Sequence, residues 1–306
     1  MKISLILTCF NEAESIEGLI SDVLSQSRIP DEMVVVDAGS RDETVQILKS
    51  FESAFSERGA LLSLHVVPGA GIAHGRNLAI GLAKYEVIAV TDAGCRLNRD
   101  WLAEITVPIT RGYADFVGGF FLPVAKTYFQ SILAALTTAK RPGRNFMPSS
   151  RSVAFRKAIW ERVGGYPEWL PWGEDTRFNT NCLEAGARYV VAADAIVHWE
   201  VRRTWRQAFT QFRRYAFGDG LARRITPSLA LTTLAHGAVV VALIAGQPAY
   251  LILIPILGAA WVMRKKGIKL RDLPYATGLA VTIQLARSFG YLAGLVSRAP
   301  KAQGQG

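Results

Sequence analysis

Acidic residues follow apolar runs at three points of the chain. Asp37 ends the run MVVVD, Asp92 ends the run VIAVTD, and Glu174 and Asp175 lie together in WGEDTRF. In an open α/β sheet, ligands bind outside the carboxyl ends of the strands, so we expect these carboxylates to meet at one edge. Hard oxygen ligands of this kind suit Mg²⁺ or Mn²⁺. The sequence therefore predicts a cleft for a metal-bound, phosphorylated ligand.

Residues 1–92 must supply the sheet that positions these carboxylates. Apolar runs predict four strands, at residues 3–7, 33–37, 62–67 and 87–92. Apolar residues at helical spacing follow the first two strands and recur at 74–84. This alternation indicates an α/β fold with a mostly parallel sheet and helices on both faces. The absence of a Gly-x-Gly-x-x-Gly motif after the first strand, and of a P-loop lysine motif, argues against dehydrogenases and P-loop NTPases.

Four sequence blocks together resemble the family 2 glycosyltransferases, which have the nucleotide-sugar-binding GT-A fold. The blocks are ILTCFNEAESI, VVVDAGSRDET, GIAHGRNLAIGLAKYEVIAVTDAG and PSSRSVAFRKAIWERVGGYPEWLPWGEDTRF, in this order. They span about residues 1–200 and are most similar to the membrane-attached members that build bacterial polysaccharides. The resemblance implies an inverting transfer of sugar from a nucleoside diphosphate sugar.

The residues after the first two strands are candidate donor-binding residues. Thr8 to Glu12 leave the first strand at the cleft, where Phe10 offers a face to a base and Glu12 accepts hydrogen bonds. The family often has Tyr at the position of Phe10, so the stacking surface is kept and the hydroxyl is lost. Asp37 can accept from a uracil or guanine edge or a ribose. Alternatively, Asp37 is a turn residue before Ala38.

Arg76, in HGRN, is the candidate cation for the diphosphate. A guanidinium can bind two phosphate oxygens with a fork of N–H donors. The alternative is a solvated arginine at the start of a helix.

Asp92 is the candidate direct metal ligand. The family usually has Asp-x-Asp here, whereas this chain has Asp92, Ala93 and Gly94, so the second carboxylate is missing. Mg²⁺ and Mn²⁺ retain waters, so one or two carboxylates are enough. Some related enzymes recruit a later histidine to the metal, which makes His198 in VHWE a second candidate. A histidine that follows a strand can instead have a structural role.

Asp175 is the candidate catalytic base, with Glu174 beside it. Inverting transfer needs a base that removes the proton of the acceptor hydroxyl as this oxygen attacks the anomeric carbon. The like charge of Glu174 favours the raised pKa that such a base needs, and Glu-Asp also resembles the catalytic pair of the family. The alternative is an acidic helix N-terminus.

The acceptor-binding candidates lie on either side of this pair in the sequence. Trp169 and Trp172 offer aromatic faces to sugar C–H groups, or are lid or core residues. Ser150 and Arg151 begin a segment that, in the resemblance, crosses the floor of the cleft.

Charge divides the chain into two parts. Residues 1–199 hold 20 Lys and Arg against 22 Asp and Glu, whereas residues 200–306 hold 15 against 3. The basic part is also the most apolar, which favours membrane lipids as a partner over nucleic acid. Residues 225–263 contain no Asp, Glu, Lys or Arg. One helix over this stretch would be about 58 Å long, which is far more than the roughly 30 Å hydrocarbon core of a membrane. The stretch therefore predicts two membrane-spanning helices.

A break at Gly246 predicts a hairpin near residues 228–245 and 248–263. Basic residues on both sides place its ends in the cytoplasm, and the N-terminus lacks the pattern of a signal peptide. A third apolar stretch at 275–296 carries Arg287, and it can span, re-enter or lie in the interface. The alternative to the hairpin is a buried helical pair of a soluble protein.

These observations predict three domains: residues 1–200 as a GT-A catalytic domain, 201–226 as an interfacial amphipathic helix, and 227–306 as a membrane anchor. The expected protein is a multi-pass protein of the inner membrane with a cytoplasmic catalytic domain. It would move a sugar from a nucleoside diphosphate sugar to a lipid-linked or other glycan acceptor. A polyprenyl-phosphate sugar synthase and an inactive nucleotide-sugar-binding membrane scaffold are the alternatives.

Overall fold

The computed structural model describes residues 1–139, 141–143, 146–247, 253–263 and 268–298. The chain forms two compact units. The first comprises Met1–Leu122 and Lys140–Glu200, and the second comprises Pro123–Ala139 and Val201–Gly306. The predicted boundary near residue 200 therefore coincides with a division of the fold, but residues 123–139 belong to the second unit and not to the first.

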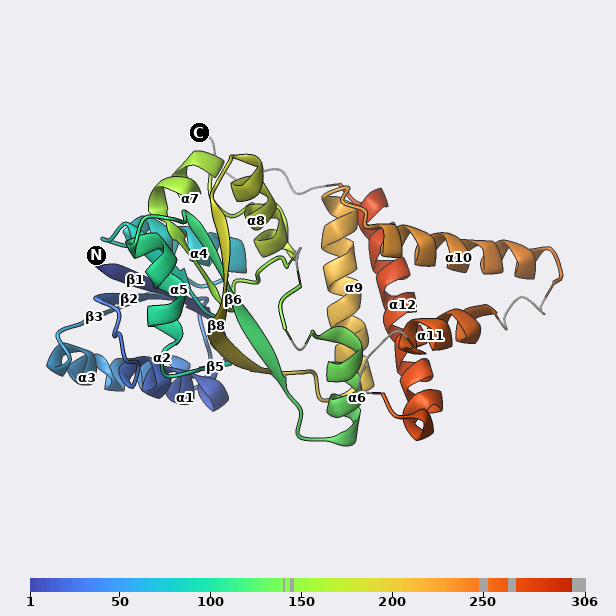
Figure 1. Cartoon of the computed structure of the whole chain (residues 1–306), viewed down its shortest axis with the longest axis horizontal. Coiled ribbons are helices and arrows are strands. Elements are labelled where there is room, and N and C mark those ends of the chain that lie inside the picture. The colour runs from blue at the N-terminus through green and yellow to red at the C-terminus, as the bar shows by residue number, and fades with distance from the viewer. Residues whose placement is uncertain (140, 144–145, 248–252, 264–267, 299–306) are drawn as a thin grey trace. The chain divides into compact units, whose positions relative to one another are not determined.

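An eight-stranded sheet forms the centre of the first unit (Figure 1). Its order is β3 (Leu61–Val66), β2 (Glu32–Asp37), β1 (Ile3–Cys9), β4 (Val87–Val90), β7 (Val153–Arg156), β6 (Phe116–Val124), β8 (Tyr189–Glu200) and β5 (Cys95–Leu97). The pairs β1–β2, β2–β3 and β1–β4 are parallel. The pairs of β7 with β4 and with β6, and of β5 with β8, are antiparallel. The expected α/β class is confirmed.

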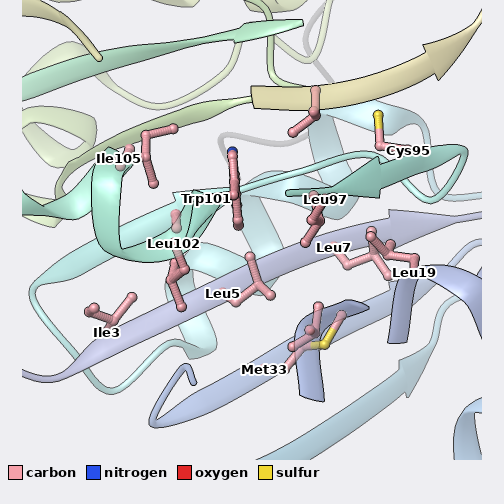
Figure 2. Close-up of a cluster of buried hydrophobic side chains, with 14 of the residues drawn as sticks. Ile3, Leu5, Leu7, Leu19, Met33, Cys95, Leu97, Trp101, Leu102 and Ile105 are labelled. Carbon is pink, nitrogen blue, oxygen red and sulfur yellow. The ribbon is translucent and has the colours of Figure 1, made fainter. Parts of the chain in front are cut away.

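Helices cover both faces of this sheet. One face packs on α1 (Ala13–Leu24), α2 (Thr44–Ser50), α3 (Glu52–Glu57) and α5 (Trp101–Thr110). Figure 2 shows Trp101 among aliphatic side chains of this layer, including Leu5 and Ile105. The other face packs on α4 (Ile72–Leu82), α7 (Lys157–Val163) and α8 (Glu174–Glu184). Every residue of β2 is buried, as expected of a strand covered on both faces.

The second unit is helical. It contains α6 (Tyr128–Thr137), α9 (Trp205–Leu221), α10 (Pro227–Ile244), α11 (Leu253–Met263), the short 3₁₀ helix η2 (Leu270–Asp272) and α12 (Leu273–Val296). Helices α9 and α12 lie side by side (Figure 1). A Cβ added to Gly290 would lie 2.1 Å from the carbonyl oxygen of Arg213, and one added to Gly220 would lie 2.2 Å from that of Tyr291. Glycine is therefore required where the two backbones meet.

The expected membrane segments correspond to helices of this unit. Helix α10 matches the predicted span at 228–245, and α12 is continuous across 275–296. Of the predicted span at 248–263, residues 248–252 lie outside the described residues. Two helical stretches among the described residues, Pro227–Ile244 and Leu270–Val296, are long and apolar enough to cross a membrane. The assignment of this unit as a membrane anchor stays a prediction.

Helix α9 corresponds to the predicted interfacial helix at 201–226. It does not present its whole surface to the outside, because one face packs on α12. The buried residues of α9 are Ala208, Gln211, Ala216, Gly218 and Gly220. The arginines Arg206, Arg213 and Arg214 are exposed. Contact of this basic face with lipid stays a prediction.

Candidate active site

Arg76 joins two of the three predicted acidic positions. Its Nη2 donates to Asp92 Oδ1 at 2.8 Å, and its Nη1 donates to Glu174 Oε1 at 2.7 Å. The guanidinium also lies 5.4 Å from the centre of the Tyr166 ring. Only 3% of the Arg76 side chain is exposed. The exit of β4, the start of α4 and the N-terminus of α8 therefore meet around one buried cation.

This burial contradicts the solvated alternative for Arg76. Each Nη atom uses one of its two N–H groups to bind a carboxylate. Burial by itself lowers the pKa of Arg76, but the charges of Asp92 and Glu174 outweigh it and raise the pKa above its ordinary value. The Nε atom is buried without a hydrogen-bond partner among the described residues. Direct contact of Arg76 with a diphosphate stays a prediction.

Asp92 lies two residues beyond β4, with 31% of its side chain exposed. Its Oδ1 accepts from Arg76, while its Oδ2 has no hydrogen-bond partner in the part of the chain that the structure describes. A Cβ added to the neighbouring Gly94 would have no atom within 4 Å. The site therefore has one carboxylate oxygen open to a ligand and room for a second carboxylate.

Asp175 is the second residue of α8, and Glu174 is the first. Oδ1 of Asp175 accepts from the backbone N–H of Thr176 at 2.7 Å. Its Oδ2 accepts longer bonds, from Ser149 Oγ at 3.3 Å and from the N–H of Ser150 at 3.4 Å. The position agrees both with a base at the cleft and with the alternative of an acidic helix N-terminus.

The surroundings of Glu174 shift the pKa of its carboxyl group. Burial raises the pKa of Glu174, the charge of Arg76 opposes this, and the charge of Asp175 adds to the increase. The net pKa of Glu174 lies above its ordinary value. Glu174 is thus the buried partner of Arg76, whereas Asp175 is partly exposed.

The segment after β1 is fixed to the segment after β2. Asn11 has a φ of 53° and its N–H donates to Ser40 Oγ at 2.8 Å. The N–H of Glu12 donates to Thr44 Oγ1 at 2.8 Å. Phe10 lies between the last residue of β1 and these anchored residues, and it is 53% exposed. An exposed ring on an anchored loop is suited to stacking on a base, as predicted.

Thr8 and Asp37 lie deeper than predicted for residues that contact a ligand. A Cβ added to Gly75 of α4 would lie 3.0 Å from the Thr8 methyl group, so the Thr8 side chain faces that helix. Asp37 is fully buried, and its Oδ1 accepts from the N–H groups of Gly39 at 2.9 Å and Ser40 at 2.7 Å. The structure therefore gives Asp37 the role of the turn alternative, and contact with a nucleotide stays a prediction.

The acceptor candidates have different environments. Ser150 is fully buried, and its hydroxyl lies 3.1 Å from the hydroxyl of Tyr166, so its side chain points into the core. Arg151 lies with its guanidinium carbon 4.3 Å from the centre of the Trp199 ring. Trp169 and Trp172 are both partly exposed, in the segment between α7 and α8. Three of the four candidates are therefore partly exposed, whereas the side chain of Ser150 is buried.

Comparison with known proteins identifies the family of this chain. A family model described as "Glycosyl transferase family 2" matches residues 4–192, which is more than half of the chain. The chain belongs to glycosyltransferase family 2. It is therefore an enzyme that transfers sugars, and the predicted resemblance is confirmed.

Curated relatives of this chain are also named as glycosyltransferases. The O-antigen chain rhamnosyltransferase RfbN of Salmonella typhimurium is 24% identical over 244 residues, which cover 74% of each chain. The glycosyltransferase AglE of Haloferax volcanii is 27% identical over 202 residues, which cover 63% of this chain and 65% of the relative.

Solved structures share the fold. The mannosyltransferase PcManGT from Pyrobaculum calidifontis, in complex with GDP-Man and Mn²⁺, superposes with a TM-score of 0.65 at 20% identity, covering 95% of this chain and 87% of that one. Residues 1–349 of TarS from S. aureus, in complex with UDP-GlcNAc, give a TM-score of 0.53 at 20% identity, covering 94% and 90%. These likenesses confirm the GT-A fold.

Of the two predicted metal ligands, Asp92 fits a divalent ion better than His198 does. Among the described residues, no group of three His, Cys, Asp or Glu side chains is arranged to hold a metal. The open Oδ2 of Asp92 fits an ion that takes its other ligands from a diphosphate and water. His198 is less suited, because its Nε2 lies 2.9 Å from Asn98 Oδ1. This contact supports the structural alternative for His198, and its metal role stays a prediction.

Three contacts of the site were not predicted. Ser149 links Arg151 to Asp175, since Arg151 Nη1 donates to Ser149 Oγ at 3.0 Å. Tyr166 lies under the Arg76 guanidinium, and Trp199 lies under that of Arg151. Trp199 is next to His198 in a strand, so the alternation of side chains could have indicated that the two residues face opposite sides. Nothing in the local sequence indicates the role of Tyr166.

Proposed function

We propose that this enzyme transfers a sugar, with inversion, from a nucleoside diphosphate sugar to a lipid-linked acceptor at the membrane. Polysaccharide or glycolipid assembly is the proposed setting. The observation that carries the proposal is the Arg76 cluster, which brings Asp92 and the N-terminus of α8 to one place. A metal-side carboxylate and a candidate base, Asp175, are thereby held at the same edge of the sheet.

In this proposal, Asp175 removes the proton of the acceptor hydroxyl. The oxygen attacks the anomeric carbon on the face opposite the diphosphate, which inverts the configuration. Oδ2 is the receiving atom, because among the described residues it accepts only the two long bonds from residues 149 and 150, whereas Oδ1 accepts from the N–H of Thr176 at 2.7 Å. Mg²⁺ or Mn²⁺, when bound at Asp92, would stabilise the charge of the leaving diphosphate.

The donor site is proposed around Phe10, Glu12 and Asp92. Phe10 would stack on the base, and Asp92 would hold the diphosphate through the metal. Solved structures of the same fold contain GDP-Man with Mn²⁺ and UDP-GlcNAc, which supports a nucleotide sugar and a divalent ion as the ligands. Asp37 would act indirectly, because it fixes the turn at Gly39 and Ser40 next to the loop that carries Phe10.

The acceptor is proposed to be lipid-linked, because the second unit has the features of a membrane anchor. Two of its helical stretches can cross a membrane by length and composition, and the charge of residues 200–306 is strongly positive. With the basic flanks in the cytoplasm, the enzyme would be a multi-pass protein of the inner membrane. An anchored active site meets lipid acceptors at high local concentration.

Two other functions can be tested beside this one. A polyprenyl-phosphate sugar synthase would transfer a single sugar to a lipid phosphate. An inactive scaffold would bind the nucleotide sugar without turnover, and the absent second carboxylate at Gly94 is the feature that favours it.

The deciding experiment supplies membranes that contain the full-length enzyme with a panel of labelled UDP-, GDP- and dTDP-sugars. We expect one donor to label a lipid extract, in a product that carries a glycosidic bond between two sugars. A product with one sugar on a lipid phosphate would identify the synthase. Nucleotide binding without any transfer would identify the scaffold.

A further inference from the structure

We propose that Arg76 is a positioning residue that fixes Asp92 and Glu174 relative to each other, and that it acts on the reaction without binding the diphosphate. This inference rests on the proposed function, in which Asp92 holds the metal and Asp175 is the base. It assigns Arg76 a task that differs from donor binding.

The geometry of the guanidinium carries the inference. Two separate nitrogen atoms bind the two carboxylates at 2.8 Å and 2.7 Å, so a planar group sets the distance between the loop after β4 and the first residue of α8. Asp92 and Glu174 are 82 residues apart in the chain, and these two bonds connect their carboxylates through one side chain. Asp175 follows Glu174 directly, so a shift of Glu174 moves the base as well.

The burial of Arg76 argues against the alternative that its guanidinium binds the diphosphate. Only 3% of the Arg76 side chain is exposed, and the Tyr166 ring covers the guanidinium at 5.4 Å. The two Nη atoms are already bonded, and only the buried Nε is without a partner among the described residues. Each Nη atom keeps a second N–H group, but a diphosphate would have to reach it at a side chain that the surrounding protein covers almost completely.

The residue after Arg76 holds the other end of the same segment. Asn77 Nδ2 donates to the carbonyl oxygen of Tyr166 at 2.8 Å, and Asn77 Oδ1 accepts from the N–H of Tyr166 at 2.8 Å. A Cβ added to Gly165 would lie 2.6 Å from Asn77 Oδ1, so the chain passes close to this amide. Helix α4 thus holds the segment from Tyr166 to Glu174 at both ends, and that segment carries Trp169 and Trp172.

Arg76→Lys is the test variant, because lysine keeps the charge but has one nitrogen in place of the divergent fork. Arg188→Lys is the matched control, because Arg188 binds Asp115 with two nitrogens at 2.8 Å each but is exposed and outside the site. Both variants are made in the full-length enzyme. Four quantities are measured: kcat at saturating donor, the Mn²⁺ concentration for half-maximal activity, the affinity in EDTA for UDP, GDP, dTDP and the corresponding monophosphates, and the melting temperature.

If Arg76 positions the site, Arg76→Lys should lower kcat by about tenfold or more and raise the half-maximal Mn²⁺ concentration. Its affinity for the nucleoside diphosphate in EDTA should stay within about twofold of wild type. Arg188→Lys should change neither kcat, nor the half-maximal Mn²⁺ concentration, nor this affinity. The double variant Arg76→Lys with Glu174→Gln should lose less than the product of the single losses, because the two residues act through one contact.

Two results would overturn the inference. The first is a loss of metal-free affinity for the diphosphate, but not for the monophosphate, with an unchanged Mn²⁺ response, which would make Arg76 a diphosphate ligand. The second is an equal loss of kcat in both variants, in proportion to melting temperature, which would make the effect one of general stability. A wild-type enzyme that transfers no sugar from any donor would instead refute the proposed function, while the metal-free binding and melting data would still report on Arg76.

Discussion

Arg76 is the buried cation that holds two carboxylates of this site together. A buried cation with two carboxylate partners is stabilising only while all three charges are present. Removal of the guanidinium would leave Asp92 and Glu174 without it, and the loss of a buried partner typically costs about 3–5 kcal/mol. A variant such as Arg76→Met therefore reports on folding as well as on catalysis, which is why lysine is the informative change.

Asp175→Asn separates chemistry from binding. The amide keeps nearly the same volume but cannot take a proton, so kcat at saturating donor should fall by about 10² to 10⁴. Nucleotide affinity, measured by calorimetry, should persist. Glu174→Gln should cost less, and Asp194→Asn, an exposed carboxylate of β8, should leave the rate unchanged. A near wild-type rate for Asp175→Asn would mean that the carboxylate is only part of the helix N-terminus.

The metal site can be altered in both directions. Asp92→Ala should abolish the divalent-dependent part of donor binding, because it removes the open Oδ2. Gly94→Asp should preserve or tighten that binding, because a Cβ at residue 94 meets no atom within 4 Å and the new carboxylate adds a second hard ligand. Calorimetry of the nucleoside diphosphate with and without Mn²⁺ measures both. Metal-independent binding by the wild type would contradict the role of Asp92.

Helices α9 and α12 pack through glycine, which makes their contact sensitive to single carbon atoms. Gly220, Gly290 and Gly294 each lie where an added Cβ would come within 2.2 Å of a backbone oxygen of the other helix. Backbone cannot move aside as a flexible side chain can, so the two helices must separate to accommodate a methyl group.

Gly290→Ala should therefore destabilise the second unit. The added methyl group would lie 2.1 Å from the Arg213 carbonyl oxygen, and overpacking of this kind costs about 1–3 kcal/mol. The matched control is Gly237→Ala in α10, where an added Cβ has no atom within 4 Å. Thermal unfolding in detergent measures the difference. Equal melting temperatures for the two variants would show that α9 and α12 do not pack in this way.

A surface ion pair next to β6 and β8 should give the first unit a pH-dependent stability. Hydrogen bonds from Arg188 lower the pKa of Asp115 to about 2. A depressed pKa stabilises the fold above the unfolded value of about 3.9, and this contribution is lost as pH falls towards about 2. Asp115→Asn should thus lower the melting temperature at pH 7 and approach the wild type between pH 4 and pH 2. Arg188→Met should show the same convergence, and a constant difference across this range would contradict the pairing.

The molecule as a whole divides by charge and hydropathy in the same place as it divides by fold. Residues 1–199 are close to neutral, whereas residues 200–306 carry 15 basic and 3 acidic residues and include both candidate spans. The exception is α6, which lies within the catalytic part of the sequence but belongs to the second unit. Within that unit, Tyr128 of α6 donates from its hydroxyl to Asp272 Oδ1 at 3.0 Å.

Membrane attachment can be tested on the full chain and on a truncation before Ser228. The full-length protein should resist carbonate extraction. The truncated protein should lose this resistance and keep nucleotide binding, but it should need detergent or anionic vesicles to stay dispersed, because it lacks the α12 surface that covers α9. Ultracentrifugation after carbonate treatment measures the first expectation. Removal of the intact protein from membranes by carbonate would refute the hairpin.

Local sequence determined the parallel half of the sheet and the apolar C-terminal helices, whereas β5, β6, β7 and β8 were not predicted. Runs such as MVVVD and the helical repeat of apolar residues depend on neighbours a few positions away, so they predicted the parallel strands and the helices between them. The position of Asp92 after β4 followed from the same patterns, as did the position of the Glu174–Asp175 pair at the N-terminus of a helix. The uncharged stretch at 225–263 likewise indicated its helices, because hydropathy over such a length is a property of composition.

Only the tertiary structure decided which side chains are partners. Arg76 and Glu174 are 98 residues apart, and no periodicity records that they meet in a buried ion pair. The same holds for Asp37, whose oxygens face its own turn, and for Ser150, whose hydroxyl turns to Tyr166. Periodicity records which face of a strand or helix is buried, whereas the partner of a buried polar group depends on which segments the fold brings together.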